Sequence, residues 1–278
     1  MLNNVNWVTA MKVENFYATH PVFTGQEFAA FLASVGTSNV RTQEALLTHH
    51  TKAGRILRLR RGLYVVVPHG TAPEDCPVDY YLLASKITDD SVLGYHTALE
   101  FHGRAYSVFE QSFYLTTRVA RPLEFRSHTF RRVLVPASLR AKGREHFGVR
   151  VAERQGVKVR VTGLERTLVD VLDRPDLSGS WEEIWRSLEM VEFFNLDEVA
   201  EYALLLGNAT TAAKVGFYLE QHRESLMVED AHLKRLRELR PKAPHYLVRG
   251  RRVPGRLVKE WNLVVPDEVF LQSWAEVL

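Results

Sequence analysis

Residues 54–68 read GRILRLRRGLYVVVP, and this stretch decides how the first part of the chain folds. Leucines alternate with arginines as far as the pair Arg61-Gly62, and the apolar run LYVVV follows. Alternation on both sides of a glycine-containing turn predicts a β-hairpin whose leucines face inward. The stretch holds four arginines and no acidic residue, so its positive charge needs an explanation.

Two helices are predicted before the hairpin. In the first, Thr24 and Glu27 have the spacing of a capping box, and apolar residues recur at helical spacing as far as Gly36. In the second, we expect Ser38 to cap the stretch VRTQEALLTHHTKA and Gly54 to end it.

The second helix has a predicted inner face of Val40, Leu47 and His50, with the neighbouring His49 on the exposed side. Two helices joined through a glycine form a helix-turn-helix, and the hairpin that follows completes a winged helix. In such folds the second helix enters the major groove of double-stranded DNA and basic side chains neutralise phosphates.

A winged helix that binds DNA therefore explains the positive charge of the hairpin and of the second helix. The residues nearest the start of the second helix are expected to read base edges, and those from Lys52 onward to contact phosphates. The alternatives are a solvated strand pair and a protein-interaction module. The predicted DNA-contacting residues are Asn39, Arg41, Thr42, Thr48, His49, Lys52, Arg55, Arg58, Arg60 and Arg61.

The bulk properties narrow the class of protein. The 278 residues are 46% hydrophobic, enough for one large domain or two ordinary ones. A single cysteine, Cys76, excludes an internal disulfide. Without a secretory signal or a long apolar run, we expect a cytoplasmic protein with no membrane partner. Residues 1–22 exceed what a winged helix needs and predict an extra helix.

Beyond the winged helix, assigned to residues 1–70, the stretch TAPEDCPVD (71–79) is predicted to be a linker to a second domain at 80–278. This domain should contain two helices, a small sheet, further helices and a late strand. The fold class is therefore α/β, more closely α+β. The predicted helices are 79–87, 91–103, 164–174, 181–194, 196–207, 210–222 and 229–240, and the predicted strands are 112–118, 123–135, 157–163 and 260–266.

Charge is unevenly distributed along the second domain. Residues 118–160 hold 12 lysines and arginines against 3 acids, and residues 161–230 hold 5 against 15. Such blocks indicate either a face that meets a charged partner or two segments that neutralise each other. Arginines interleaved with aromatic residues could form a second contact surface for DNA or a protein, or an arginine-rich strand edge that discourages aggregation. They are Arg118, Arg121, Arg126, Arg131 and Arg132.

The stretch VTGLERTLVDVLDR offers the carboxylates Glu165, Asp170 and Asp173 for metal catalysis, as in a nuclease or a nucleotidyl-transferring enzyme. A structural interpretation is stronger, because Asp170 has arginines four residues away on both sides and Thr162 has capping-box spacing to Glu165. His96 and His102 lie six apart, which puts them on different helix faces. We therefore expect no catalytic residues, no metal site and no cofactor.

Three stretches together resemble the AbiEi family, the antitoxins of abortive-infection, type IV toxin-antitoxin systems. They are GRILRLRRGLYVV, YLLASKITDDSVLGYHTALEFHG and VTGLERTLVDVLDRPDLSG. Within the last of them, the residues that match the family pattern are Glu165, Arg166, Thr167 and Asp170, for which a structural role is favoured over contact with a toxin.

The resemblance implies a winged helix that binds inverted repeats in the protein's own promoter and represses the operon. It also implies a C-terminal domain that counteracts a co-encoded nucleotidyltransferase toxin, with direct contact left open. Palindromic sites can be filled by a dimer or by monomers that pair cooperatively. The alternative function is a winged-helix transcriptional regulator whose second domain senses a small molecule.

Overall fold

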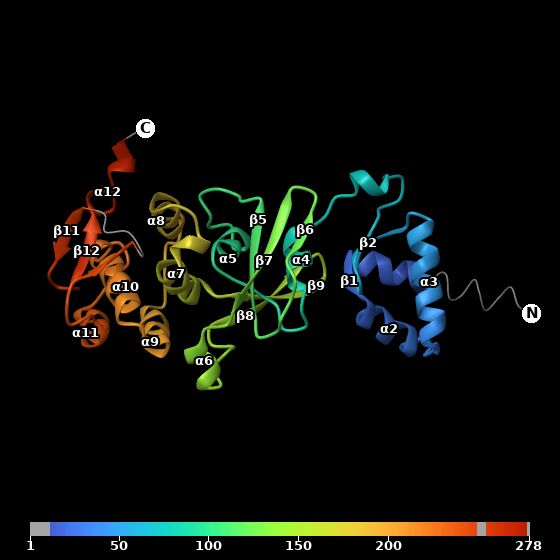
Figure 1. Cartoon of the computed structure of the whole chain (residues 1–278), viewed down its shortest axis with the longest axis horizontal. Helices are drawn as coiled ribbons and strands as arrows, with labels where there is room; N and C mark the ends of the chain where they lie inside the picture. Colours follow the sequence, from blue (N-terminus) through green and yellow to red (C-terminus); the bar gives the residue numbers. More distant parts are fainter. Residues whose placement is uncertain (1–11, 249–253, 277–278) are drawn as a thin grey trace, which may run out of the picture.

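The computed structural model describes residues 12–248 and 254–276. Three parts follow one another along the molecule: a winged helix, a central sheet with its helices, and a helical part that carries a small sheet (Figure 1). This arrangement confirms the α+β class. Within the described ranges, no helix has the length and apolar character needed to span a bilayer.

The winged helix occupies the end of the chain predicted for it. Residues 12–19 are helical. Of the extra helix predicted within 1–22, residues 1–11 lie outside the described residues, residues 20 and 21 are loop, and Val22 begins strand β1. The first and third strands pair antiparallel, as do the second and third, in the order β1-β3-β2. The elements are β1 (Val22–Thr24), α2 (Gly25–Ser34), α3 (Val40–Lys52), β2 (Ile56–Arg60) and β3 (Leu63–Val66).

The central part is built on a six-stranded mixed sheet of order β6-β7-β5-β4-β9-β8. The β5–β7 and β4–β9 pairs are parallel, and the other neighbours are antiparallel. The elements are η1 (Pro73–Asp75), α4 (Tyr80–Ser85), β4 (Val92–Leu93), α5 (His96–Phe101), β5 (Gln111–Thr116), β6 (Leu123–Phe125), β7 (His128–Leu134), α6 (Ala137–Ala141), β8 (Val149–Arg154) and β9 (Val157–Thr162).

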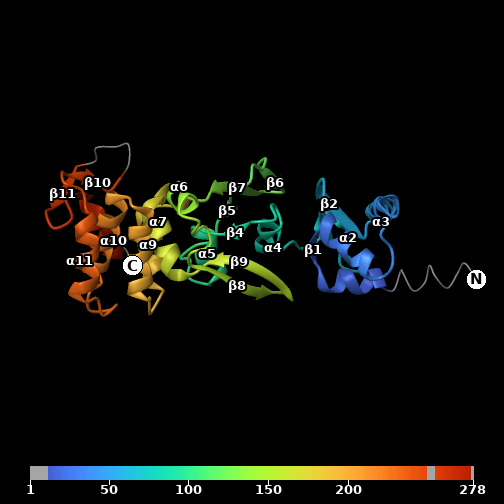
Figure 2. The same ribbon diagram turned by 90° about the horizontal axis from the view of Figure 1, so that it is seen from below.

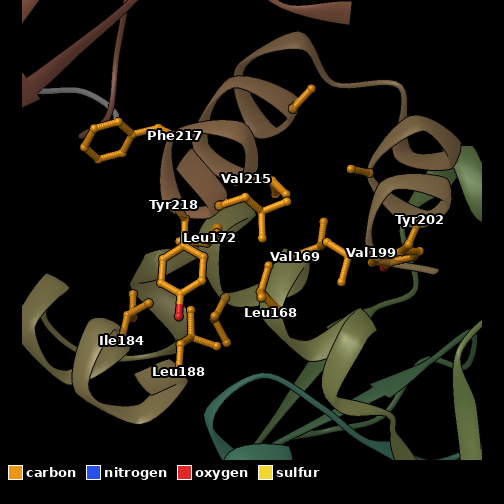
Figure 3. Packing of buried hydrophobic residues seen from close by; sticks show 14 of the residues in the cluster. Leu168, Val169, Leu172, Ile184, Leu188, Val199, Tyr202, Val215, Phe217 and Tyr218 are labelled. Atoms are coloured by element: carbon orange, nitrogen blue, oxygen red, sulfur yellow. The ribbon is translucent and has the colours of Figure 1, made fainter. Parts of the chain in front are cut away.

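The helical part packs its apolar faces around Leu168, Trp185 and Tyr218, and Figure 3 shows side chains from several helices meeting there. The predicted late strand is β12, which pairs with β10 and β11 in a small sheet. The elements are α7 (Leu164–Asp173), η2 (Pro175–Leu177), α8 (Trp181–Glu189), α9 (Leu196–Leu206), α10 (Ala209–Gln221), α11 (Asp230–Leu239), β10 (His245–Tyr246), β11 (Gly255–Val258), β12 (Leu263–Pro266), α12 (Asp267–Phe270) and η3 (Ser273–Glu276).

Three predicted elements need correction. The helix expected over 91–103 begins only at His96, after the short strand β4 and after Tyr95, whose φ is 56°. The strand expected over 123–135 is the hairpin β6–β7, reversed at Arg126 with φ 55°. The helix expected over 181–194 ends at Glu189. Strand pairing, not local propensity, determines the first two of these boundaries.

The winged-helix sheet is covered on both faces. Ile56 and Tyr64 face the N-terminal helices, in a core with Phe28 and Leu47. From the other face of the sheet, a set of aliphatic side chains packs against α4 and the central sheet: Val22, Leu57, Leu59, Leu63 and Val65. The leucines of the hairpin therefore face the central part, not the helices. The winged helix and the central part share one hydrophobic core.

An ion pair between Lys86 and Glu27 joins the two parts at the edge of this shared core. Glu27 also completes the predicted capping box, because its carboxylate accepts from Thr24 N at 2.8 Å and Glu27 N donates to Thr24 Oγ1 at 3.2 Å. Burial alone would raise the pKa of Glu27, but hydrogen bonds from Lys86 and Thr24 hold it below its ordinary value.

The variant Glu27→Gln keeps a capping side chain but loses the charge that faces Lys86. At neutral pH we expect it to lower the free energy of unfolding by about 1 kcal/mol, because this pair is less exposed than ordinary surface pairs. A depressed folded-state pKa stabilises above the ordinary Glu pKa and loses that effect as pH falls through the folded value.

Urea unfolding at neutral and acid pH measures the difference, which should vanish in acid. The matched control is Glu44→Gln on α3, an exposed carboxylate with no ion pair in the described parts of the chain. Equal losses in the two variants, or a difference that persists in acid, would contradict the assignment.

Candidate nucleic-acid interface

Helix α3 is held in place from its inner side. Leu47 is buried in the N-terminal core, and Gln43 Nε2 donates to the carbonyl of Gly25 at 2.6 Å. Gly25 N in turn donates to the carbonyl of Gly62 in the wing turn at 2.9 Å. Gly62 has φ 78°, a conformation that glycine adopts without strain. The start of α2, the first turn of α3 and the wing turn are therefore linked to one another by hydrogen bonds.

The N-cap of α3 is Asn39, which corrects the prediction of Ser38. Asn39 Oδ1 accepts from Arg41 N at 2.9 Å, so the side-chain oxygen proposed for a base edge is engaged in capping. The first turn of α3 carries no acidic residue. Its amide groups and the positive end of the helix dipole therefore favour an anion such as a phosphate.

The outer side of α3 is open to solvent. All six residues predicted there are exposed: Asn39, Arg41, Thr42, Thr48, His49 and Lys52. Val40, expected to face inward, is 65% exposed, because the short connection from α2 leaves the first turn of α3 outside the core.

The two adjacent histidines separate as predicted. His50 is half-buried, with its ring 5.4 Å from that of Tyr17, while His49 is exposed. Burial lowers the pKa of His50. Of the two rings, that of His49 is the one exposed to solvent, where it could meet a DNA groove.

The hairpin arginines fall into two groups. Arg58 and Arg61 are exposed, and within the described residues no carboxylate lies at ion-pair distance from either. Arg55, in contrast, pairs with Glu14 at 2.5 Å, and Arg60 donates to the carbonyl of Ile87 in the central part. The prediction of four equivalent phosphate contacts therefore needs correction, because two of these guanidinium groups already have partners within the chain.

A cleft of about 1600 Å³ separates α2, α3 and the wing from the central part. Its far wall includes Lys158 and Arg160 of β9, which the prediction of the interface missed. Lys158 is exposed, and Arg160 donates to the carbonyl of Asp89. The only sequence signal was the alternation VKVRV, which indicates a strand but not what its charged side faces. Figure 2 shows the β8–β9 hairpin directed toward the winged helix.

The five arginines of the predicted second contact surface do not share one face. Arg131 and Arg132 are neighbours on β7 and point to opposite sides of the sheet. Several have partners within the chain. Arg118 pairs with Asp89 at 3.3 Å, Arg126 donates to the carbonyl of Glu74 at 2.7 Å, and Arg132 donates to the carbonyl of Arg118 at 3.0 Å. Arg121 is exposed.

Part of the basic block is neutralised by acidic segments elsewhere in the chain. Arg144 pairs with Glu201 at 3.2 Å and Arg150 with Glu198 at 2.8 Å, both across to the helical part. Arg154 pairs with Asp79 at 2.5 Å. Of the two interpretations of the charge blocks, mutual neutralisation accounts for these cations.

Of the four residues that match the AbiEi pattern, Arg166, Thr167 and Asp170 lie on the buried side of α7 and form a hydrogen-bonded network there. Arg166 Nε donates to Asp170 at 3.3 Å, and Arg166 Nη1 donates to the carbonyl of Phe147 at 2.7 Å. Tyr202 donates to Asp170 Oδ1 at 2.6 Å, and the side chain of Thr167 lies 2.8 Å from that of Thr162. Arg166, Thr167 and Asp170 are almost wholly buried, so a partner does not reach them.

Two details of the motif differ from expectation. Gly163, not Thr162, is the N-cap of α7, and Glu165 Oε1 accepts from Asn195 N at 3.3 Å. Arg174 pairs with Asp176 at 2.8 Å, not with Asp170. The spacing of four residues therefore predicted the ion pair of Asp170 with Arg166 correctly, but the pair with Arg174 was wrong.

The carboxylates and histidines considered for metal binding are engaged separately. Asp173 accepts from Thr211 and Asn208, while Asp170 faces Arg166. His102 Nε2 lies 2.8 Å from the carbonyl of Thr162, on the side of α5 away from His96. Across the described ranges, no three His, Cys, Asp or Glu side chains gather as metal ligands would.

Comparisons with known proteins find a similar fold but give no information on the candidate interface. The chain matches no family model and no curated protein. Its fold is similar to that of the Rv2827c protein from Mycobacterium tuberculosis, known from a crystal structure. The TM-score is 0.60 at 17% sequence identity, over 96% of this chain and 94% of that one. At this identity the likeness shows the fold alone.

Proposed function

We propose that this chain is a DNA-binding antitoxin that represses its own toxin-antitoxin operon and counteracts a co-encoded nucleotidyltransferase toxin. The observation that carries the DNA-binding half is an exposed, cation-bearing α3 with Arg58 and Arg61 beside it, two exposed arginines that have no ion pair among the described residues. The antitoxin half is supported by the resemblance of three sequence stretches to the AbiEi family.

The geometry suits a duplex because α3 and the wing turn are fixed relative to each other. Arg41, Thr48 and Lys52 follow one another at helical spacing on the exposed side of α3. A helix lying in a major groove would direct its first turn, with Arg41, to the base edges, and Lys52, Arg58 and Arg61 toward the flanking phosphates.

The decisive experiment compares the DNA upstream of the protein's own gene with a scrambled duplex of equal length. The full-length chain should bind the upstream DNA more tightly, with an affinity that falls steeply as salt rises. The absence of a salt-dependent preference for the upstream DNA would refute the DNA-binding half.

The antitoxin half is tested separately, in cells. Expression of the neighbouring gene should arrest growth, and co-expression of this chain should restore it even when the shared promoter is replaced. A neighbouring gene without a nucleotidyltransferase signature, or growth that stays arrested, would refute this half while leaving DNA binding intact.

A variant of Arg41 should alter sequence preference. Arg41 is exposed at the first turn of α3 and is the best placed of the predicted residues for a bidentate contact to guanine. Arg41→Ala is expected to reduce discrimination at one base-pair position of each half-site by about 1–3 kcal/mol. Competition binding over single base-pair variants of the upstream site measures this.

The matched control is Lys52→Ala, which removes one exposed cation from the last turn of the same helix. It should weaken binding to all the variants by a similar factor. If Arg41→Ala also weakens them uniformly, Arg41 contacts the DNA backbone and not a base.

A further inference from the structure

A cavity of about 620 Å³ lies at the junction of the winged helix and the central part. One wall comes from the winged-helix sheet, through Val22 and Val65, which are paired in register across β1 and β3. The opposite walls come from the start of α4 and from the loop that leads into β5. A volume of this size is typical of small-molecule sites. An occupant would contact both parts of the chain at once.

Ring systems held by stacking line the central side of the cavity. Tyr80 stacks on His128 with ring centroids 4.1 Å apart, and Phe109 stacks on His96 at 3.6 Å. Tyr81 packs edge-on against Phe101. These contacts fix the rings before any ligand binds, so flat apolar surfaces are already in place. At the rim, Val108 is 81% exposed.

The polar groups of the cavity carry an excess of negative charge. Asp79, Glu100 and Glu110 line it, against one guanidinium, that of Arg154. Arg154 is already neutralised by Asp79 at 2.5 Å and lies over the ring of Tyr81.

Glu100 is held at the inner end by neutral donors. Its side chain is 2% exposed, and it accepts from Phe109 N at 2.8 Å and from the Tyr81 hydroxyl at 3.2 Å. The nearest basic group is His96, whose Nε2 lies 3.2 Å away and also 3.0 Å from the carbonyl of Ser107. Among the described residues, no lysine or arginine lies at ion-pair distance from Glu100 or Glu110.

We propose that this cavity binds a small organic cation with a planar aromatic body. The rings of Tyr80, Tyr81 and Phe109 match the body, and the carboxylates of Glu100 and Glu110 attract the positive group. The site lies apart from α3 and the wing arginines, so it stands whether or not the chain binds DNA. Because its walls come from two parts of the fold, the ligand stabilises their junction.

The test uses the full-length chain, with tryptamine as the cationic probe and indole-3-acetate as an anion of the same ring system. Tryptamine should raise the midpoint of thermal unfolding in a saturable manner, and indole-3-acetate should not. No saturable rise with tryptamine at millimolar concentration would overturn the proposal, and so would an equal rise with the anion.

Two exposed positions locate the binding without disturbing the core. Glu110→Gln should weaken tryptamine binding by about threefold to fivefold, the scale of one partly exposed charge pair. Val108→Trp should abolish it by filling the mouth of the cavity. Matched controls are Glu124→Gln on β6 and Val119→Trp, both exposed and both outside the cavity lining. Binding that is unchanged in both cavity variants would place tryptamine elsewhere and overturn the proposal.

Discussion

Replacing Arg58 and Arg61 together by alanine should weaken binding of the chain to every duplex, with little change in sequence preference. Both guanidinium groups are exposed and free of ion pairs within the described chain, so each is available to neutralise one phosphate. Neutralising a phosphate releases condensed counterions, and the slope of log affinity against log salt should therefore fall by about one for each arginine removed. Fluorescence anisotropy over a salt series measures the slope.

The matched control removes the same charge at the other end of the molecule. Lys234 on α11 and Lys259 beside β11 are exposed cations, and Figure 1 places both elements far from α3. The double variant Lys234→Ala, Lys259→Ala should leave the salt slope unchanged. If it reduces the slope as much as the wing variant does, the effect is one of net charge and the wing has no special role.

Arg60→Ala provides an internal contrast within the same strand. Its guanidinium donates to the carbonyl of Ile87 in the central part. Its removal should therefore lower the free energy of unfolding and change the salt slope less than removal of Arg58 or Arg61 does.

Replacing Arg166 by methionine should have the largest effect on stability, about 3–5 kcal/mol of the free energy of unfolding. Arg166 is 1% exposed and provides the only guanidinium within ion-pair distance of Asp170 among the described residues. Methionine fills most of the volume but leaves the carboxylate buried without a counter-charge. Urea unfolding followed by circular dichroism measures the loss.

A second readout separates this cause from simple loss of packing. Burial raises the pKa of Asp170, opposed in the native chain by the attraction of Arg166. A raised folded-state pKa favours the protonated native state, so the deficit of Arg166→Met should shrink as pH falls. A packing defect would persist at all pH values.

The control for this variant is Arg144→Met. Arg144 pairs with Glu201 on the surface, with both side chains about half exposed, so the loss should stay below about 1 kcal/mol. Equal losses at the two positions would contradict the assignment of a buried ion pair.

The elements that local signals specify were predictable from the sequence. The capping box of Thr24 and Glu27 begins α2 as expected, and the glycine turn at Gly62 separates β2 from β3. The six exposed residues predicted on α3 also follow from helical spacing around the buried Leu47, whereas Val40, predicted to face inward, is 65% exposed. Each of these features depends on residues within a few positions of one another.

The parts of the interface that were wrong depend on distant partners. Arg55 meets Glu14 and Arg60 meets the carbonyl of Ile87, partners that are 41 and 27 residues apart along the chain. Alternation predicts one strand face for Arg58 and Arg60, but a register shift between them places Arg58 opposite Tyr64 and Arg60 opposite Leu63, which face different sides of the sheet. For the same reason, the facing cations of β9 across the cleft could not be assigned to the interface from sequence.

Other misses come from conformations that carry no sequence signature. Tyr95 and Arg126 adopt positive φ without being glycine or asparagine, and each interrupts a predicted element. Strand β4 has only two residues, and its place in the sheet depends on partners on both sides. Periodicity needs a longer stretch than this to be recognised.

Because both faces of the winged-helix sheet are covered, the winged helix is not suited to being produced as a separate fragment. A fragment ending at residue 70 would leave Leu57, Leu63 and Val65 facing water, and this apolar strip would invite self-association. The winged helix is thus packed against the central part and is not joined to it by a linker alone. On a palindromic operator, the distance at which two copies fit side by side would be fixed by the bulk of the whole chain.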